Sequence, residues 1–230
     1  MTQPKISIIV PAFNEEKYIE STIQAIRKWT YDKEIIIVDD GSTDKTKEIL
    51  MKIASDSVVK PIFLKLNQGK GQALKAGVKQ AEGEVIMFLD ADLGDSAKDA
   101  DRLLDPIFKN DADMTIAILP RSSMKAGFGL VKKLARSGIY FMTGYQPIAP
   151  LSGQRAMKRK VIDQITELVS GFGIEVGLTI DVLRMGFKIK EVEVALYHRE
   201  TGRDLKGFIH RGKEFIAVAK ALFIKWRQQR

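Results

Sequence analysis

Short apolar runs alternate with longer amphipathic segments through the first half of the chain. The runs, rich in Ile and Val, cover residues 5–10, 34–39, 61–66, 84–89 and 114–118. The segments between them have apolar side chains at helical spacing, and they cover residues 15–28, 44–54, 71–81 and 96–108. This alternation predicts a Rossmann-type, three-layer α/β/α fold with a mostly parallel central sheet.

The second half of the chain has a less regular pattern. A Gly-rich and basic stretch fills residues 121–144, and a hairpin-like pair of strands is predicted around residues 188–197. Helices are predicted near residues 158–168, 174–185 and 212–227. Because no repeat or low-complexity segment separates the halves, we expect residues 1–230 to form a single domain around one shared sheet.

The composition excludes several classes of protein. Of the 230 residues, 45% are hydrophobic and 29% are charged, which is typical of a globular domain and not of a disordered or fibrous chain. Without cysteine there can be no disulfide, thiolate metal site or catalytic thiol. The N-terminal residues resemble a strand more than a secretion signal, and no segment is apolar enough to span a membrane. We therefore expect a cytoplasmic protein.

The net charge of +8 is unevenly distributed along the chain. Residues 1–115 contain 16 Lys and Arg against 20 Asp and Glu, whereas residues 116–230 contain 21 against 9. The excess of positive charge in the second half could serve a nucleic acid, an anionic membrane surface or a phosphorylated substrate. Charge alone does not decide between these partners.

The strongest candidate for chemistry is the segment LDADL, which ends the fourth apolar run. Asp90 and Asp92 flank the small residue Ala91, so their carboxylates can converge where the strand gives way to a loop. Such oxygen ligands suit Mg²⁺ or Mn²⁺ that keeps water and phosphate as its other ligands. The alternative is a solvated acidic loop, but the preceding apolar strand and the upstream motifs favour a metal site.

Two other acidic segments end predicted strands at the same edge of the sheet. IIVPAFNEE follows the first strand, and IVDDGSTD follows the second. Ligands of parallel sheets bind beyond the carboxyl ends of the strands, where a carboxylate can accept hydrogen bonds from a nucleobase or a ribose. Residues 39–44 alone would be interpreted as a turn and helix cap. Three acidic strand ends together favour a nucleotide.

A Gly-Lys-Gly segment precedes the third predicted helix. Gly69, Lys70 and Gly71 form a basic loop at a helix N-terminus, a place suited to an anion. Leu74 stands where the G-x-G-x-x-G motif requires its third Gly, and the segment is not a P-loop, so a dinucleotide oxidoreductase and a P-loop kinase are excluded. Lys70 is a candidate contact for a diphosphate, with an ordinary solvated Lys as the alternative.

Two segments of the second half are both basic and amphipathic. Lys132 and Lys133 lie among apolar residues in one, and Lys213, Lys220 and Arg227 recur every seven residues in the other. In one interpretation, the apolar faces complete the core and the basic residues are solvated. In the other, the helices dock on an anionic bilayer. The nearby aromatic residues fall on helical apolar faces and form no stacking platform, which argues against a nucleic acid.

The motifs together resemble those of a known family. PAFNEE, VDDGSTD, NQGKGQALKAG and LDADL resemble the nucleotide-sugar-dependent glycosyltransferases of family 2, which have the GT-A fold. TIAILPR, PLSGQRAM, GFGIEVGLTIDVLRMGFKIKEVEV and YHRETG are similar to the branch of dolichyl-phosphate mannose synthase and polyprenyl-phosphate glycosyltransferases. The resemblance covers nearly the whole chain. It implies that residues 1–119 bind the nucleotide sugar and residues 120–230 bind the acceptor.

The resemblance also implies roles for individual residues. The nucleotide-sugar contacts would be Pro11, Ala12, Phe13, Glu15, Val38, Asp40, Lys70, Asp90, Ala91 and Asp92. The metal would be held by Asp90 and Asp92, and phosphates of the acceptor or leaving group by Arg121, Arg199 and Arg203. The catalytic set would be Asp92, Glu175 and Arg199.

Two positions depart from the pattern of this branch. His198 stands where Asp is usual, and Arg203 and Asp204 stand where Glu-Ser is usual. A His at this point is similar to the glucosyl-3-phosphoglycerate synthases, in which a His completes the metal site. His198 is therefore a candidate third metal ligand, with a hydrogen-bonded surface His as the alternative.

Glu175 has two interpretations. It begins a predicted helix, where the dipole favours a carboxylate, and the resembling families place a carboxylate here near the acceptor. A hydroxyl acceptor needs a base to remove its proton, whereas a phosphate acceptor is already ionised and needs positioning. We favour acceptor positioning for Glu175.

The sequence therefore predicts a glycosyltransferase that depends on Mg²⁺ or Mn²⁺ and uses a UDP- or GDP-sugar. The expected acceptor is phosphorylated, with a polyprenyl phosphate at the inner face of the cell membrane preferred. One alternative is a soluble enzyme similar to glucosyl-3-phosphoglycerate synthase. The other is a non-catalytic basic protein that binds a membrane or a nucleic acid. Either a monomer or a homodimer is compatible with the sequence.

Overall fold

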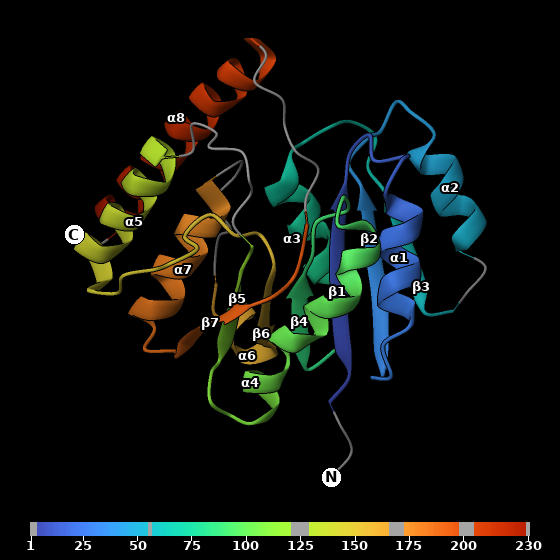
Figure 1. The fold of residues 1–230 in the computed structure, drawn as a ribbon, viewed down its shortest axis with the longest axis horizontal. Coiled ribbons are helices and arrows are strands. Elements are labelled where there is room, and N and C mark those ends of the chain that lie inside the picture. Colours follow the sequence, from blue (N-terminus) through green and yellow to red (C-terminus); the bar gives the residue numbers. More distant parts are fainter. Residues whose placement is uncertain (1–3, 55–56, 121–128, 166–172, 198–204, 229–230) are drawn as a thin grey trace.

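A seven-stranded sheet forms the centre of the computed structural model, which describes residues 4–54, 57–120, 129–165, 173–197 and 205–228, with side chains in the last segment from residue 212 onward. The strands are β1 (Ile6–Ala12), β2 (Lys33–Asp39), β3 (Val59–Phe63), β4 (Val85–Phe88), β5 (Met114–Ile118), β6 (Arg155–Lys158) and β7 (Ile189–Glu193). Their order across the sheet is β3-β2-β1-β4-β6-β5-β7 (Figure 1).

The pairing of the strands confirms a mostly parallel sheet. β1 pairs in parallel with β2 and β4, β2 with β3, and β5 with β7, whereas β6 runs antiparallel between β4 and β5. The sequence pattern does not predict β6, because its four residues, RAMK, have a basic residue at each end. The hairpin predicted around residues 188–197 is wrong, since β7 is a single strand that pairs with the distant β5.

Helices cover both faces of the sheet, as predicted for three layers. The helices are α1 (Ile19–Arg27), α2 (Thr46–Ile53), α3 (Lys70–Gln80), the 3₁₀ helix η1 (Gly94–Leu103), α4 (Asp105–Phe108), α5 (Gly129–Thr143), α6 (Arg159–Ile162), α7 (Ile174–Arg184) and α8 (Leu205–Arg227). Alternate residues of β1 point to opposite faces of the sheet and pack in two separate apolar cores. Ile8 packs with α1, α2 and η1 on one face, and Ile9 packs with α3, α6 and α7 on the other.

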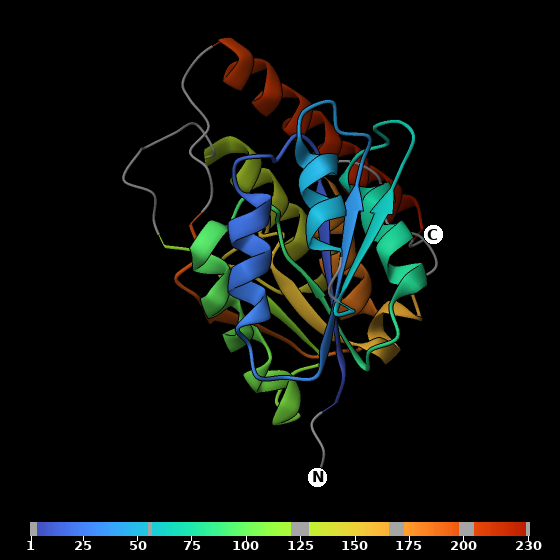
Figure 2. The same ribbon diagram turned by 90° about the vertical axis from the view of Figure 1, so that its right-hand side faces the viewer.

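A third apolar cluster lies outside the three layers. Val131 and Ile139 of α5 pack there with Val176 of α7 and with Val218 and Leu222 of α8. Gly138 permits this approach, because a Cβ at its position would lie 2.4 Å from a methyl group of Leu222. Helices α5 and α8 thus form an added pair on the outer side of α7 (Figures 1 and 2).

The loops after β2 and β3 meet at the carboxyl-terminal edge of the sheet. Gly41 has a φ of +72°, and a Cβ at its position would lie 2.8 Å from the Leu66 carbonyl carbon. Because the obstructing atoms are backbone, a larger residue would push the two loops apart. The glycine therefore sets how closely the acidic end of β2 approaches the N-terminus of α3.

Asp113 connects β5, β6 and β7 at the edge of the sheet that lies opposite the acidic motifs. Its carboxylate accepts hydrogen bonds from Lys158 Nζ at 3.1 Å and the Lys188 amide at 3.1 Å, and it lies 2.9 Å from Lys160 Nζ. Burial alone would raise the pKa of Asp113, but the bonds from Lys160, the Lys188 amide and Lys158 lower that pKa to about 2. The carboxylate therefore stabilises the folded state in its ionised form.

We expect Asp113→Asn to lower the free energy of unfolding at pH 7 by about 2 kcal/mol. The folded-state pKa lies below the unfolded value, so the contribution is complete above about pH 4 and disappears as the pH falls through 2. Urea denaturation of both proteins from pH 7 to pH 2 measures the difference. Asp111→Asn is the matched control, because Asp111 is half-exposed and 3.6 Å from Lys190. Equal stability of Asp113→Asn and wild type at pH 7 would contradict this role.

Candidate active site

The first two acidic motifs are bonded to each other at the carboxyl-terminal edge. The Asn14 amide donates to Ser42 Oγ at 2.9 Å, and the Thr43 amide donates to Asn14 Oδ1 at 2.8 Å. The Glu15 amide donates to Thr46 Oγ1 at 2.9 Å. Asn14 has a φ of 56°, a conformation that Asn tolerates better than most residues. The loops after β1 and β2 thus form one continuous rim.

Asp40 lies inside this rim and holds the loop before α3. Its two carboxylate oxygens accept hydrogen bonds from the Gln68 amide at 2.8 Å and the Gly69 amide at 2.7 Å. Asp40 is buried. Each carboxylate oxygen has two acceptor sites, so these bonds leave acceptor capacity for a nucleobase. The structure therefore gives Asp40 a structural task in addition to the predicted contact with the donor.

Lys70 connects the metal motif to α7. Its Nζ lies 2.7 Å from Asp90 Oδ1 and 3.1 Å from Glu175 Oε1. Gln154 Nε2 donates to Asp90 Oδ2 at 2.9 Å. A Cβ at Gly153 would lie 2.4 Å from Lys70 Nζ, so the absence of a side chain there leaves the space that Lys70 fills. The first residue of α3, the loop after β4, the segment before β6 and the first turn of α7 therefore meet at one point.

The ammonium of Lys70 offsets part of the negative charge of this cluster. Burial alone would lower the pKa of Lys70, but the charges of Asp90 and Glu175 raise it well above its usual value. Glu175 is buried in the first turn of α7. A cation is therefore already balanced against two carboxylates at the position where the sequence predicts a metal and a diphosphate.

The turn that contains Asp92 is held by α1. Thr22 Oγ1 donates to the Ala91 carbonyl at 2.8 Å and accepts from the Gly94 amide at 2.8 Å. Thr22 has no exposed surface. Asp92 lies half-buried on this turn. The backbone on both sides of Asp92 is thus held by the side chain of Thr22.

The donor atoms of this site fit a hard divalent cation. Asp90 and Asp92 supply carboxylate oxygens, which suit Mg²⁺ or Mn²⁺ with water and phosphate as the remaining ligands. Within the part of the chain that the structure describes, no group of three or more His, Cys, Asp or Glu residues could hold a metal ion. The predicted third ligand, His198, lies outside the described residues, as do Arg121, Arg199 and Arg203.

The other predicted donor contacts differ in exposure. Phe13 is exposed at the rim, and Pro11 and Glu15 are half-buried beside it. Ala12 and Val38 are buried, and Val38 belongs to the core cluster beneath α3. Because it is buried, the side chain of Val38 can contribute to a nucleobase site only through the core packing beneath that site.

Arg155 is a buried cation to which the sequence analysis assigns no role. Its Nε donates to the Ser152 carbonyl at 2.9 Å, and its Nη1 donates to Thr179 Oγ1 at 2.9 Å. Thr179 donates in turn to the Glu175 carbonyl at 2.8 Å, so Arg155 supports the first turn of α7. Burial lowers the pKa of Arg155 to about 10, against the charges of Glu175 and Glu191. A basic residue in a short buried strand is the signal that could have identified it.

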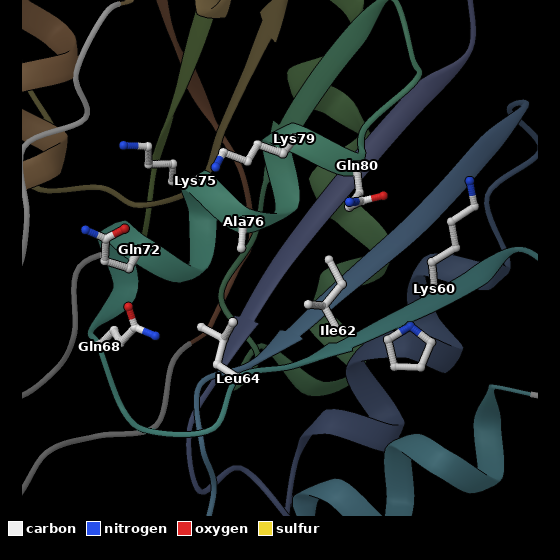
Figure 3. A pocket seen from close by; sticks show the side chains of 10 residues that line it. Lys60, Ile62, Leu64, Gln68, Gln72, Lys75, Ala76, Lys79 and Gln80 are labelled. Atoms are coloured by element: carbon white, nitrogen blue, oxygen red, sulfur yellow. The ribbon is translucent and has the colours of Figure 1, made fainter.

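An open groove of about 480 Å³ lies along α3 and β3, beside this site (Figure 3). Gln68, Gln72, Lys75 and Lys79 line it from the side of the helix, and Ile62 lies on the strand opposite. None of the carboxylates of the predicted site lines the groove. The groove is therefore separate from the Lys70 cluster.

Comparison with known proteins identifies the family. The sequence model described as glycosyl transferase family 2 matches residues 7–166, well over half of the chain. The chain belongs to this family. Membership confirms the resemblance seen in the motifs and makes the protein a glycosyltransferase.

Two relatives differ in how much of their length they share with this family member. An uncharacterised protein of Methanocaldococcus jannaschii is 32% identical over 97% of this chain and 91% of its own length. The undecaprenyl-phosphate 4-deoxy-4-formamido-L-arabinose transferase of Pectobacterium atrosepticum is 42% identical over 44% of this chain. The matched part spans about a third of that transferase, 32% of its length.

Solved structures confirm the fold. Glucosyl-3-phosphoglycerate synthase of Mycobacterium tuberculosis, crystallised with Mn²⁺, UDP and phosphoglyceric acid, superimposes with a TM-score of 0.77 at 25% identity. The likeness covers 95% of this chain and 77% of the synthase. The GT-A-like α/β fold expected from the motifs is therefore confirmed.

Proposed function

We propose that the protein transfers a sugar from a UDP- or GDP-sugar to a phosphorylated acceptor with the aid of Mg²⁺ or Mn²⁺. The observation that carries the proposal is the cluster of Asp90, Lys70 and Glu175 at the carboxyl-terminal edge of the sheet. It combines a carboxylate for a metal, a cation for a diphosphate and a second carboxylate at a helix N-terminus. A bound divalent cation would be held by Asp90 and Asp92 and would neutralise charge on the leaving diphosphate.

In this proposal the other residues of the site bind and orient the substrates. The rim of Phe13 and Glu15 receives the nucleoside together with Asp40, and Lys70 lies beside the diphosphate. Glu175 orients the acceptor, because an ionised phosphate requires no general base. The predicted phosphate contacts, which lie outside the described residues, are Arg121, Arg199 and Arg203.

The comparisons support a phosphorylated acceptor and favour a polyprenyl phosphate. Relatives that match just under half of the chain are named undecaprenyl-phosphate transferases, and one of Escherichia coli is named a prophage bactoprenol glucosyl transferase homologue. We therefore propose that the protein acts at the inner face of the cell membrane. The second candidate is transfer to a soluble acceptor such as phosphoglycerate, which the structural likeness to the mycobacterial synthase supports.

Donor and acceptor panels test the proposal. We expect Mn²⁺ together with one UDP- or GDP-sugar to raise the thermal midpoint, because a ligand that binds only the folded state stabilises it. With that donor, the purified protein should glycosylate undecaprenyl phosphate in detergent and leave 3-phosphoglycerate unmodified. The reverse preference would favour the second candidate. If no nucleotide sugar raises the midpoint with Mn²⁺ or Mg²⁺, both candidates are contradicted.

A further inference from the structure

Helix α8 is fixed to the protein through one of its faces. Val218 and Leu222 belong to the third apolar cluster, and Lys225 Nζ lies 2.6 Å from Asp181 Oδ2 of α7. Arg184 Nη1 donates to the Lys225 carbonyl at 2.8 Å. Lys225 is buried, so the ion pair and the cluster place the same face of α8 against the protein.

A second face of α8, next to the buried one, is also apolar. Phe215, Ile216, Phe223 and Trp226 are 43%, 68%, 56% and 38% exposed. Their spacing, with Ala219 between them, places them along one side of the helix. The rings of Phe223 and Trp226 contact each other, with centroids 6.2 Å apart. We call these five residues the outer stripe. Sequence periodicity alone did not reveal two apolar faces, since it predicts only that such a helix is amphipathic.

Basic residues border the outer stripe. Lys213, Lys220 and Arg227 follow one flank of it, and all three are exposed. Between residues 212 and 228, where side chains are described, no exposed position is Asp or Glu. An apolar surface with positive charge along one flank is complementary to a surface that is both apolar and anionic.

Helix α5, which shares the third apolar cluster with α8, also has exposed apolar residues. Leu130 and Phe141 of α5 are 73% and 81% exposed, and Lys133 lies on the same side of that helix. The first turns of α8 project beyond the carboxyl-terminal edge of the sheet, the edge that contains the candidate active site (Figures 1 and 2). A flat surface that contacts α8 would therefore lie near the acceptor side of the site.

We propose that the outer stripe of α8, with its basic flank, docks on an anionic lipid bilayer. Exposed Phe, Ile and Trp beside Lys and Arg are typical of helices that lie in the membrane interface. None of the described helices is long and apolar enough to cross a bilayer. Self-association through the outer stripe of two copies would bring like charges together without a carboxylate between them, which is unfavourable.

This inference rests on the proposed function, since docking on a bilayer would bring the site to a lipid-phosphate acceptor in that bilayer. Lipid binding is nevertheless measured without donor or acceptor, so the two proposals can fail separately. Binding without transfer would contradict the proposed function alone. Transfer to a soluble acceptor without lipid binding would contradict the docking alone.

The experiment uses the full chain and vesicles with and without phosphatidylglycerol. We expect co-sedimentation with phosphatidylglycerol vesicles at low salt, and loss of binding in high salt or with phosphatidylcholine alone. Trp226 provides a direct signal of binding. The other tryptophan of the chain, Trp29, is buried and donates a hydrogen bond to the Lys98 carbonyl. The fluorescence of Trp226 should shift to shorter wavelength on binding.

Paired variants identify the docking surface. Phe215→Ser with Phe223→Ser, and Lys213→Gln with Lys220→Gln and Arg227→Gln, should each lower the vesicle partition coefficient on the order of 100-fold. The matched controls are Met51→Ser with Leu66→Ser, and Lys75→Gln with Lys79→Gln, which change exposed residues elsewhere. They should bind as wild type does.

Three results would overturn the docking proposal. The first is wild-type protein that stays in the supernatant with phosphatidylglycerol vesicles. The second is equal binding by the Phe215→Ser, Phe223→Ser variant and wild type. The third is a stable dimer in light scattering that the same substitutions convert to a monomer, because the outer stripe would then be occupied by a second copy.

Discussion

Asp92→Ala is expected to abolish sugar transfer while leaving the protein folded. In the proposed site Asp92 would hold the divalent cation, whose charge would stabilise the leaving diphosphate by several kcal/mol. Turnover should therefore fall by a factor on the order of 10³. The turn itself is held by Thr22, so the thermal midpoint should change by no more than about 2 °C.

Transfer of radiolabelled sugar under saturating Mn²⁺ measures this loss, and thermal denaturation checks the fold. Asp95→Ala is the matched control, since Asp95 is an exposed carboxylate three residues along the chain that has no assigned role. Asp92→Ala, unlike this control, should also lose the Mn²⁺-dependent part of the stabilisation by UDP. Full turnover by Asp92→Ala, with the fold intact, would refute the metal role of this residue.

The sequence predicts the carboxyl-terminal edge of the sheet well, for a local reason. Each acidic motif directly follows a buried strand, and parallel strands bring such ends together whatever the rest of the chain does. The rim formed by Asn14, Ser42 and Thr43 and the position of Asp90 are consequences of this arrangement. The strands themselves are recognised because they are apolar along most of their length.

Contacts between segments that are distant in the chain could not be predicted from the sequence. The pairing of Lys70 with both Asp90 and Glu175 depends on the missing side chain at Gly153, which lies over eighty residues away from Lys70. The short strand β6 has no periodic pattern, so its insertion between β4 and β5 is fixed by tertiary packing alone. The same packing buries the side chain of Val38 in the core, and the nucleotide contact of this residue stays a prediction.

The Lys70 cluster contains residues from both the acidic and the basic half of the chain. Asp90 and Lys70 come from the acidic half, but Gln154 and Glu175, which complete their cluster, come from the basic half. The division into a donor half and an acceptor half remains a prediction, and the described contacts show that both halves build the Lys70 cluster. A substitution of Gln154, just before β6, should therefore affect a site whose acidic motifs lie in the first half.

Arg155→Met is the substitution for which we expect the largest loss of stability. The guanidinium is buried and charged, and its removal leaves the Ser152 carbonyl without its donor and takes away one of the positive charges near Glu175, the other being Lys70. Breaking a buried charge network in this way costs about 3–5 kcal/mol of unfolding free energy. Urea denaturation at pH 7 measures the loss.

The matched control for Arg155→Met is Arg159→Met, four residues further along. Arg159 also donates to backbone carbonyls, those of Gly83 and Ala81, but its side chain is partly exposed, so its loss should cost about 1 kcal/mol. Arg155→Lys should recover part of the stability, since it restores the charge without the paired hydrogen bonds. Because Arg155 acts through Thr179 on the turn that contains Glu175, Arg155→Lys should raise the KM for the acceptor more than it lowers kcat. If Arg155→Met unfolds at the same urea concentration as Arg159→Met, Arg155 does not hold β6 against α7.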